Sequence, residues 1–243
     1  MIKKRNLVWI LLLCLSCCLG CSEPEKEKPA AVMIKTPLIS LSEPDFLEEL
    51  DLKKSAYPYA IDKDPAEYNG MVIQLVNMLS EEMILLSAAG DLGVTVTETE
   101  VNAAEAEIKA DYPENTFDEM LLKNAISYSL WKKRLKKNLI IDKLLDREIR
   151  HKVEITSEDL VEFYRKYNME DPRDLKKKNK EPQKIIDENE LVSILRMQKT
   201  EDAYEAWLKE LELKYPVEIN KEALKPLLID IDEKEENNNE KTD

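Results

Sequence analysis

The chain has 243 residues and a formal net charge of −14 at pH 7. This acidity argues against nucleic-acid binding, which depends on basic surface. All four cysteines lie between Cys14 and Cys21, so the rest of the chain cannot form a disulfide and must be stabilised by its core. Only four glycines, together with abundant Glu, Lys, Leu and Ala, predict a mainly helical protein, long enough for one substantial domain.

The N-terminus has the features of a secretory signal. "MIKKR" is a basic n-region, and "LVWILLLCL" is an apolar segment too short to be a good bilayer span. The following "CLGCS" resembles the lipobox of bacterial lipoproteins, in which the cysteine, here Cys21, is lipidated before cleavage. We therefore expect residues 1–20 to be a lipoprotein signal peptide, with an ordinary signal peptide as the alternative.

Lipidation at Cys21 has consequences for charge and location. Cleavage would remove Lys3, Lys4 and Arg5, which takes the net charge from −14 to −17. Several acyl chains on Cys21 would anchor the protein stably to a membrane of the bacterial cell envelope, facing the periplasm. Ser22, where an aspartate would retain a lipoprotein in the inner membrane, favours the outer membrane. Residues 21–31, "CSEPEKEKPAA", are rich in charge and proline and predict a solvated tether.

The predicted domain begins with two short strands and two helices. The strands are Val32–Ile34 and Leu38–Leu41, separated by Thr36 and Pro37. A helix is expected from near Ser42, and a second one is capped by Asp64 and ends at Gly90.

The second of these helices is apolar on most of its faces. One stripe at helical spacing consists of Val72, Leu75, Val76, Leu79, Met83 and Leu86. Beside it lie Met71, Met78 and Leu85, at intervals of seven residues. Methionine adapts to varied surfaces, so these three are our candidate residues for contact with unfolded client polypeptides. The alternative is that they are core residues.

Later segments predict five more helices and a closing strand. Thr97 with Glu100 forms a capping box, and Thr156 with Asp159 a weaker one. Between them we expect a short helix in "TFDEMLLKNA" and a long amphipathic helix in "SYSLWKKRLKKNLIIDKLLDREIRHK". The last long helix precedes "PVEIN", a single β-like run that needs a partner strand. The acidic, asparagine-rich residues 225–243 predict a disordered tail.

The order and spacing of four segments resemble the N-terminal chaperone domain of the SurA/PrsA-type periplasmic foldases. They are "IKTPLISLSEPDFLEEL", "AAGDLGVTVTETEVNAAEAEIKADYPENTFDEML", "WKKRLKKNLIIDKLLDREI" and "VEITSEDLVEFYRKY". The resemblance implies a mainly α fold in which residues 32–167 and 185–224 form one helical domain. It also implies a small β element that joins the two ends, with Val217–Ile219 pairing with a strand in Val32–Leu41.

In that family a parvulin-type prolyl isomerase module commonly follows the helix that corresponds to "SEDLVEFYRKY". Here the intervening residues 168–184 are a charged linker, too short and too polar to form a core. A parvulin site also needs more than one histidine, and His151 is the only one in the chain. We therefore expect no isomerase activity and no enzyme function.

Other chemistry is not indicated. A single histidine and no cysteine after the anchor exclude the usual zinc sets, and isolated glycines exclude a phosphate loop. We therefore expect no metal and no cofactor. A basic run in the long helix could contact anionic lipid or could be a solvated face. It comprises Lys132, Lys133, Arg134, Lys136 and Lys137.

The sequence thus favours a membrane-anchored, ATP-independent periplasmic chaperone that holds unfolded or outer-membrane client proteins. The main alternative is a lipoprotein subunit that docks to one defined envelope complex. A prolyl isomerase is a third and weaker alternative.

Overall fold

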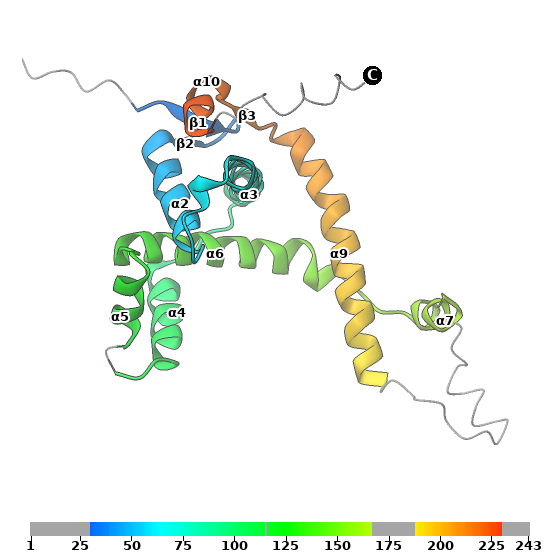
Figure 1. Cartoon of the computed structure of the whole chain (residues 1–243). Coiled ribbons are helices and arrows are strands. Elements are labelled where there is room, and N and C mark those ends of the chain that lie inside the picture. Colours follow the sequence, from blue (N-terminus) through cyan, green and yellow to red (C-terminus); the bar gives the residue numbers. More distant parts are fainter. Residues whose placement is uncertain (1–29, 115, 167–187, 230–243) are drawn as a thin grey trace, which may run out of the picture. The chain divides into compact units, whose positions relative to one another are not determined.

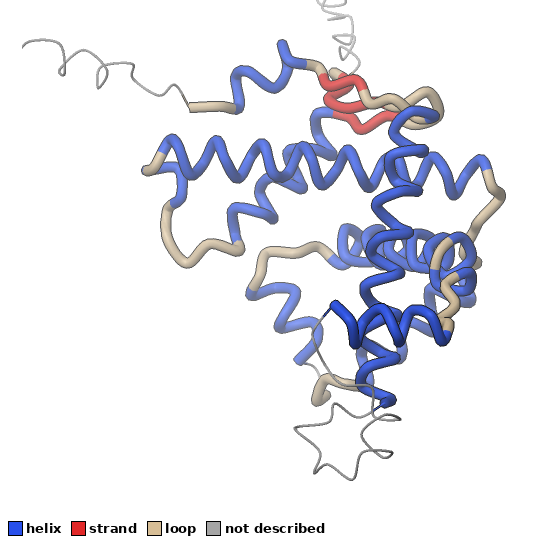
Figure 2. Tube along the Cα trace, turned by 90° about the vertical axis from the view of Figure 1, so that its right-hand side faces the viewer, coloured by secondary structure: helices blue, strands red, loops and turns tan. Residues whose placement is uncertain are grey.

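The computed structural model describes residues 30–114, 116–166 and 188–229. The expected signal peptide, most of the tether, the expected linker at 168–184 and most of the expected tail lie outside these ranges. Helices make up most of the described chain, and the strands form one small sheet, as Figure 2 shows. The predicted mainly α fold with a small β element is confirmed.

The sheet has three strands, β1 (Val32–Lys35), β2 (Ser40–Ser42) and β3 (Glu218–Ile219), in the order β2-β1-β3. Both pairings are antiparallel, and Ile34 lies opposite Ile219. The predicted pairing of the two ends of the domain is therefore confirmed. The turn after β1 is closed by Thr36, whose hydroxyl accepts the Ile39 amide at 3.2 Å and bonds the buried Ser87 hydroxyl at 2.8 Å. This bond joins the sheet to the longest helix of the first half.

Two helices follow the sheet and begin where the sequence predicts. Helix α2 (Glu43–Ser55) is capped by the Ser42 hydroxyl, and α3 (Pro65–Asp91) by the Asp64 carboxylate, after the short 3-10 helix η1 (Ile61–Lys63). Helix α3 stops because Gly93 adopts a left-handed φ of 66°. The Val94 amide then donates to the Ala89 carbonyl at 2.8 Å, which satisfies a carbonyl left free at the helix end.

Three helices and a 3-10 turn form the middle of the chain. They are α4 (Glu98–Ala110), α5 (Thr116–Lys123), α6 (Tyr128–Glu148) and η2 (Arg150–Lys152). The predicted capping box is present, since Thr97 and Glu100 each bond the other's backbone amide. Helix α6 packs against α3 and α4 (Figure 1).

The last part of the described chain returns to the first. Helix α7 (Ser157–Lys166) packs on α9 (Glu188–Lys214), and α9 continues towards β3 (Figure 1). After β3 come α10 (Lys221–Leu224) and η3 (Lys225–Leu227). The start of the disordered tail that the sequence predicts, at residue 225, is therefore too early. Residues 225–229 are ordered because Leu227, Leu228 and Ile229 pack on the core.

Three clusters of buried apolar side chains hold these elements together. The first lies between the sheet, α2 and the N-terminal half of α3; the second joins the end of α3 to α6 and α9; the third joins α7 to α9. Helix α3 contributes to the first two clusters. It is long and apolar enough to span a membrane by composition, but most of its apolar positions form the interior of this domain.

Candidate functional site

The three candidate client-contact residues occupy different environments. Met71 and Leu85 are buried, at 2% and 5% exposure, and belong to separate core clusters. Only Met78 reaches the surface, with 43% of its area exposed. A seven-residue spacing drifts around an α-helix of 3.6 residues per turn, and α2, α6 and α9 cover α3 at different points along its length. The core alternative therefore describes Met71 and Leu85, and no continuous groove joins the three.

Met78 lines an open cavity of about 340 Å³. Its walls come from the end of α2, from α3, from the α5–α6 connection and from α6. The lining residues are Glu49, Leu52, Lys53, Ser55, Ala56, Leu75, Met78, Asn124, Ile126 and Arg134. The lining is thus part apolar, from residues such as Leu75 and Met78, and part charged, from Glu49, Lys53 and Arg134. This cavity can receive an apolar side chain from another molecule.

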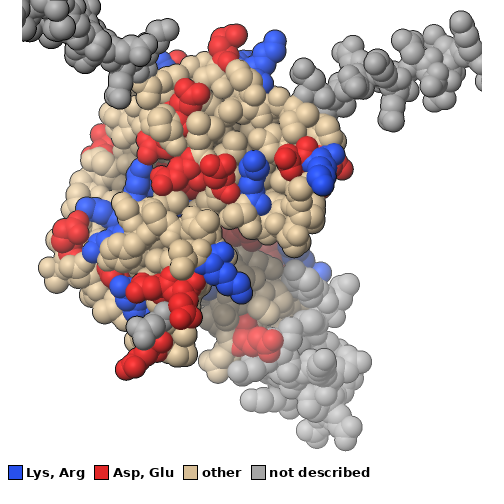
Figure 3. All heavy atoms as spheres, turned by 60° about the vertical axis from the view of Figure 1, so that its left-hand side comes forward, with Lys and Arg blue, Asp and Glu red and all other residues tan. Residues whose placement is uncertain are grey.

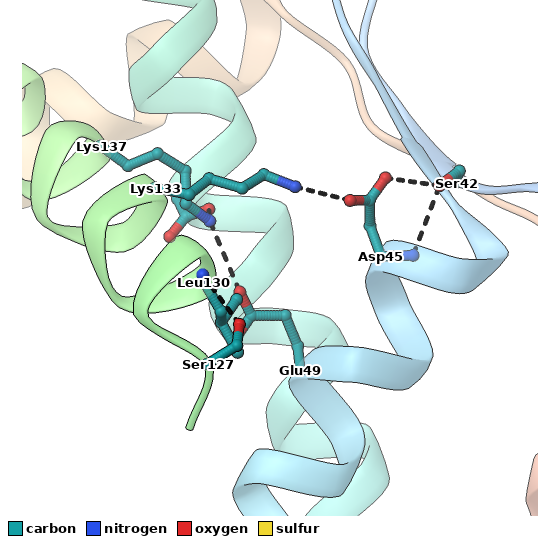
Figure 4. A network of polar contacts seen from close by, with 8 residues as sticks. Ser42, Asp45, Glu49, Ser127, Leu130, Lys133 and Lys137 are labelled. Carbon is teal, nitrogen blue, oxygen red and sulfur yellow. Dashed lines mark hydrogen bonds and ion pairs between the residues drawn. The ribbon is translucent and has the colours of Figure 1, made fainter. Parts of the chain in front are cut away.

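The basic run of α6 forms ion pairs with acidic residues of neighbouring helices. Lys133 bonds Asp45 of α2 at 2.6 Å (Figure 4). Arg134 contacts Glu49 of the same helix at 3.2 Å. Lys132 and Lys136 reach acids of α4, and Lys137 reaches Glu49 and Glu82. The run is partly a solvated face, since Lys133 and Lys136 are 54% and 45% exposed, but the sequence did not predict its ion pairs.

Glu49 is the centre of this network and the one buried carboxylate in the described part of the chain, at 6% exposure. A buried charge is costly unless it is paired, and both Arg134 and Lys137 lie within ion-pair distance of it. At the edge of the network, hydrogen bonds from Lys133 and Ser42 lower the pKa of Asp45. The network fixes α2 against α6, so the walls of the Met78 cavity are held in place.

A second cavity lies between the C-terminal part of α6 and the middle of α9. It has a volume of about 330 Å³ and is lined by Leu145, Ile149, Arg150, Met197, Thr200, Glu201 and Tyr204. Met197 is 64% exposed, whereas Ile149 at the opposite wall is buried. Most of the lining surface is apolar, and the cavity is open to solvent. This cavity is therefore a second place where an apolar side chain can bind.

Polar contacts keep this second cavity in shape. The Tyr204 hydroxyl donates to Glu81 of α3, and burial together with this bond raises the pKa of Tyr204, so it stays protonated. Nearer the end of α9, Lys214 and the Tyr215 hydroxyl both bond Asp91, at 2.6 and 2.8 Å. These contacts attach α9 to α3 beside the cavity.

A third cavity, of about 530 Å³, lies at the α3–α4 turn and is lined mainly by polar residues. Its cations already have partners. Lys143 donates to the Thr95 carbonyl at 3.1 Å and Arg147 to the Leu92 carbonyl at 3.2 Å, so both hold the turn against α6. His151 bonds the Asp146 carbonyl at 2.6 Å, at the helix end where the sequence places it. Within residues 30–114, 116–166 and 188–229, no group of acids and His forms a possible metal site.

Charged side chains of both signs are spread over the surface. On the face drawn in Figure 3, acidic and basic groups alternate with uncharged surface. Many of them are paired, as in Lys143 with Glu100 and Lys199 with Asp159. Each lysine lowers the pKa of its partner carboxylate to about 2, and the threonine that caps the carboxylate's own helix contributes to this shift.

Comparisons with known proteins find similarity among solved structures. No family model matches this sequence, and no curated protein matches it. Among solved structures, the fold matches a chain from a study of PEB4 and Cj1289, two structurally related SurA-like chaperones of Campylobacter jejuni. The match has a TM-score of 0.51 at 13% identity and covers 79% of this chain and 99% of the other. The fold of this protein is thus that of a SurA-like chaperone.

Sequence reasoning missed the cavity between α6 and α9. The sequence predicts an amphipathic helix here, but nothing local indicates that α9 leaves space beside Leu145 and Ile149. Met197 carried a signal, because it is an adaptable apolar residue in a segment rich in charged residues. Tyr204 carried none, since its bond to Glu81 joins residues 123 positions apart.

Proposed function

We propose that this protein is an ATP-independent chaperone that binds unfolded polypeptides in a bacterial cell envelope. The observation that carries the proposal is the SurA-like fold, supported by two open cavities with apolar walls. Unfolded chains expose large apolar side chains that a folded protein buries. Cavities of about 330 and 340 Å³ are at the lower end of the range for ligand pockets and suit one such side chain each.

The binding would be reversible and would not involve a chemical reaction. Met78 and Met197 place flexible, polarisable side chains at the two cavities, and such side chains adapt to varied partners. Each cavity stands on a rigid support, the first on the Glu49 ion pairs and the second on the Tyr204–Glu81 bond. Weak contact at several such places retains an unfolded chain without selecting one sequence.

We include in the proposal a lipid anchor at Cys21 and an outer-membrane location. The support is the lipobox-like "CLGCS" and the serine that follows it. A Cys21→Ser variant should be released from membranes and should lack the lipid in a mass spectrum. Retention of this variant in the membrane fraction would contradict the anchor, and fractionation of the native protein tests the outer-membrane location.

The proposal excludes prolyl isomerase activity. Its ground is that residues 168–184 are too few to form a separate domain, since domains below about 40 residues seldom fold without disulfides or metals. The measurement is the rate of a proline-limited refolding reaction with and without the protein. Acceleration in proportion to its concentration would refute this part of the proposal.

The central test is suppression of aggregation in the absence of nucleotide. Several unrelated proteins are diluted from denaturant, and light scattering is recorded with increasing amounts of the chain. A chaperone suppresses scattering for most of them. Suppression for none would refute the proposal, and binding to one envelope complex alone would favour the docking subunit named above.

The role of the Met78 cavity can be tested with a matched pair of variants. Met78→Glu places a charge in the cavity, and Ile73→Glu places the same charge on the same helix at a 52% exposed residue that does not line it. We expect Met78→Glu alone to weaken suppression. Equal effects of the two variants would show that this cavity is not a client site.

A further inference from the structure

The cavity between α6 and α9 is preformed and has an asymmetric rim. Tyr204 is fixed by Glu81. Leu145 lies in α6, which the fully buried Leu144 anchors, and Ile149 caps the end of this helix. Two charged residues reach the lining, Arg150 from η2 and Glu201 from α9. These two residues differ in whether a residue of opposite charge pairs with them.

Arg150 is already neutralised. Its guanidinium bonds Asp142 at 2.7 Å and Asp146 at 2.6 Å, both on α6, so two carboxylates surround one cation. Glu201 is exposed and forms no hydrogen bond or ion pair with any other residue that the structure describes. The neighbouring Glu81 adds a further negative charge behind Tyr204. The surroundings of this apolar cavity are therefore net negative.

We infer that this cavity selects client segments in which a large apolar side chain stands next to a lysine or arginine. The apolar side chain would fill the space against Leu145, Ile149 and Met197, and the neighbouring cation would pair with Glu201. The inference rests on the proposed chaperone function and specifies which unfolded segments one of its two cavities prefers.

The Met78 cavity is lined by basic residues instead and provides a comparison within the same molecule. It is lined by Lys53, which has no partner among the residues that the structure describes, and by Arg134, which shares Glu49 with Lys137. A basic segment gains nothing there. The preference for basic neighbours therefore belongs to the α6–α9 cavity and should respond to changes at Glu201 only.

The experiment uses short Gly/Ser-rich peptides that carry one Phe flanked by two Lys, two Glu or two Ser. Their binding to the mature chain with Cys21→Ser is measured by fluorescence anisotropy. We expect the Lys-flanked peptide to bind about two- to five-fold more tightly than the Ser-flanked one, as for a solvent-exposed ion pair. The difference should vanish in 1 M salt, where the screening length falls to about 3 Å.

Variants of α9 locate the effect. Glu201→Lys should reverse the order of the Lys- and Glu-flanked peptides, and Glu201→Gln should abolish the difference between them. Glu210→Gln is the matched control, because Glu210 is an exposed acid of the same helix, two and a half turns further on, outside the cavity. Thr200→Trp fills the cavity and should weaken Lys-flanked and Ser-flanked peptides alike.

A single-cysteine variant gives a readout independent of affinity. Because no cysteine follows Cys21, Met197→Cys can be labelled with a photocrosslinker. It should crosslink the Lys-flanked peptide most strongly. Melting temperatures of all variants show whether the fold is retained.

The outcomes separate this inference from the proposed function. If the peptides bind in the same order in Glu201→Lys as in the native chain, the inference is wrong, even where aggregation is still suppressed. If Thr200→Trp instead abolishes a dimer seen by sedimentation, the cavity binds a second copy and the inference is also wrong. Failure to suppress aggregation of any substrate refutes the proposed function itself.

Discussion

The sheet end of the domain and the crossing of α6 and α9 are built in different ways. At the sheet, backbone pairing and side-chain amides join the two ends of the chain. Asn220 donates to the Val32 carbonyl at 3.0 Å, and Asn69 bonds both the amide and the carbonyl of Ile229, at 2.9 and 2.7 Å. At the crossing, α6 and α9 share a few buried side chains and leave a cavity open to solvent.

The difference indicates a division between support and binding. Directional hydrogen bonds to the backbone specify one geometry, so the sheet end can hold the first core cluster in place. An open apolar cavity leaves burial incomplete and is available to another molecule. Five predictions test this division, in order of decreasing expected effect.

Truncation after Tyr215 should have the largest effect. It removes β3, the Asn220 contact and the half-buried side chains that cover the first cluster, namely Val217, Leu224, Leu227, Leu228 and Ile229. At about 1 kcal/mol for each half-buried aliphatic side chain, the loss is about 5 kcal/mol. The melting temperature should fall by about 10–20 °C, as measured by circular dichroism. Unfolding like that of the full chain would show that the sheet end is not the support.

Leu144→Ala should be the most damaging single substitution near the crossing. Leu144 is fully buried in the second cluster, where α6 contacts α3 and α9. Such a truncation costs about 2–5 kcal/mol in the free energy of unfolding, which urea denaturation measures. Leu122→Ala, at a leucine with 81% exposure, is the control and should cost little. A similar cost for both would mean that the second cluster contributes little.

Asn69→Ala should have an intermediate effect. It removes both hydrogen bonds to Ile229, so its cost should be about 1–2 kcal/mol. Asn77→Ala changes an exposed asparagine of the same helix, for which the described chain offers no hydrogen bond, and should be neutral. Hydrogen exchange at the Ile229 amide should accelerate only in the first variant. Unchanged exchange there would contradict the role given to Asn69.

Acid should loosen α7 from α9 before it affects the sheet. Lys199 lowers the pKa of Asp159 from 3.8 to about 2 and bonds it at 2.8 Å. Because the pKa is lower in the folded state, this contribution to stability is present above the unfolded value of 3.8 and is lost as pH falls towards 2. Exchange of α7 amides should rise over this range. In Asp159→Asn the rise should be absent, and its persistence there would assign it to other groups.

Met197→Ala should have the smallest effect on stability. Its side chain is 64% exposed at the cavity, so the free energy of unfolding should change by less than about 0.5 kcal/mol. Aggregation suppression should nevertheless weaken. A large loss of stability would show that Met197 supports the crossing, and the division drawn above would then be wrong.

Helix boundaries could be predicted from the sequence because their causes are local. Ser42, Asp64 and Thr97 cap the helices that follow them. The end predicted at Gly90 is one residue short, since α3 runs to Asp91 and the left-handed residue is Gly93. The pairing of β3 with β1 is predicted by the family resemblance alone, since no local pattern indicates which strand pairs with "PVEIN".

The candidate site depended on tertiary placement and was predicted only in part. Met78 is exposed at a cavity, but Met71 is not, because covering elements differ along α3. The basic run of α6 suggested lipid or solvent because its partners, Asp45, Glu49 and the acids of α3 and α4, are distant in sequence. The predicted start of the tail is too early because composition alone does not show that the Ile229 amide donates to the Asn69 side chain.

The sheet also determines the order in which parts of the chain can fold. Asn220 and Val32, which bond across the sheet, are separated by 188 positions. During synthesis or export, β1 therefore has β2 as its partner long before β3 appears, and its other edge stays unpaired. Closing so long a loop is an entropic cost that is met late, so contacts of this kind slow folding. Refolding of the whole chain should therefore end with a slow phase in which β3 docks, and this phase should be missing from the chain cut after Tyr215.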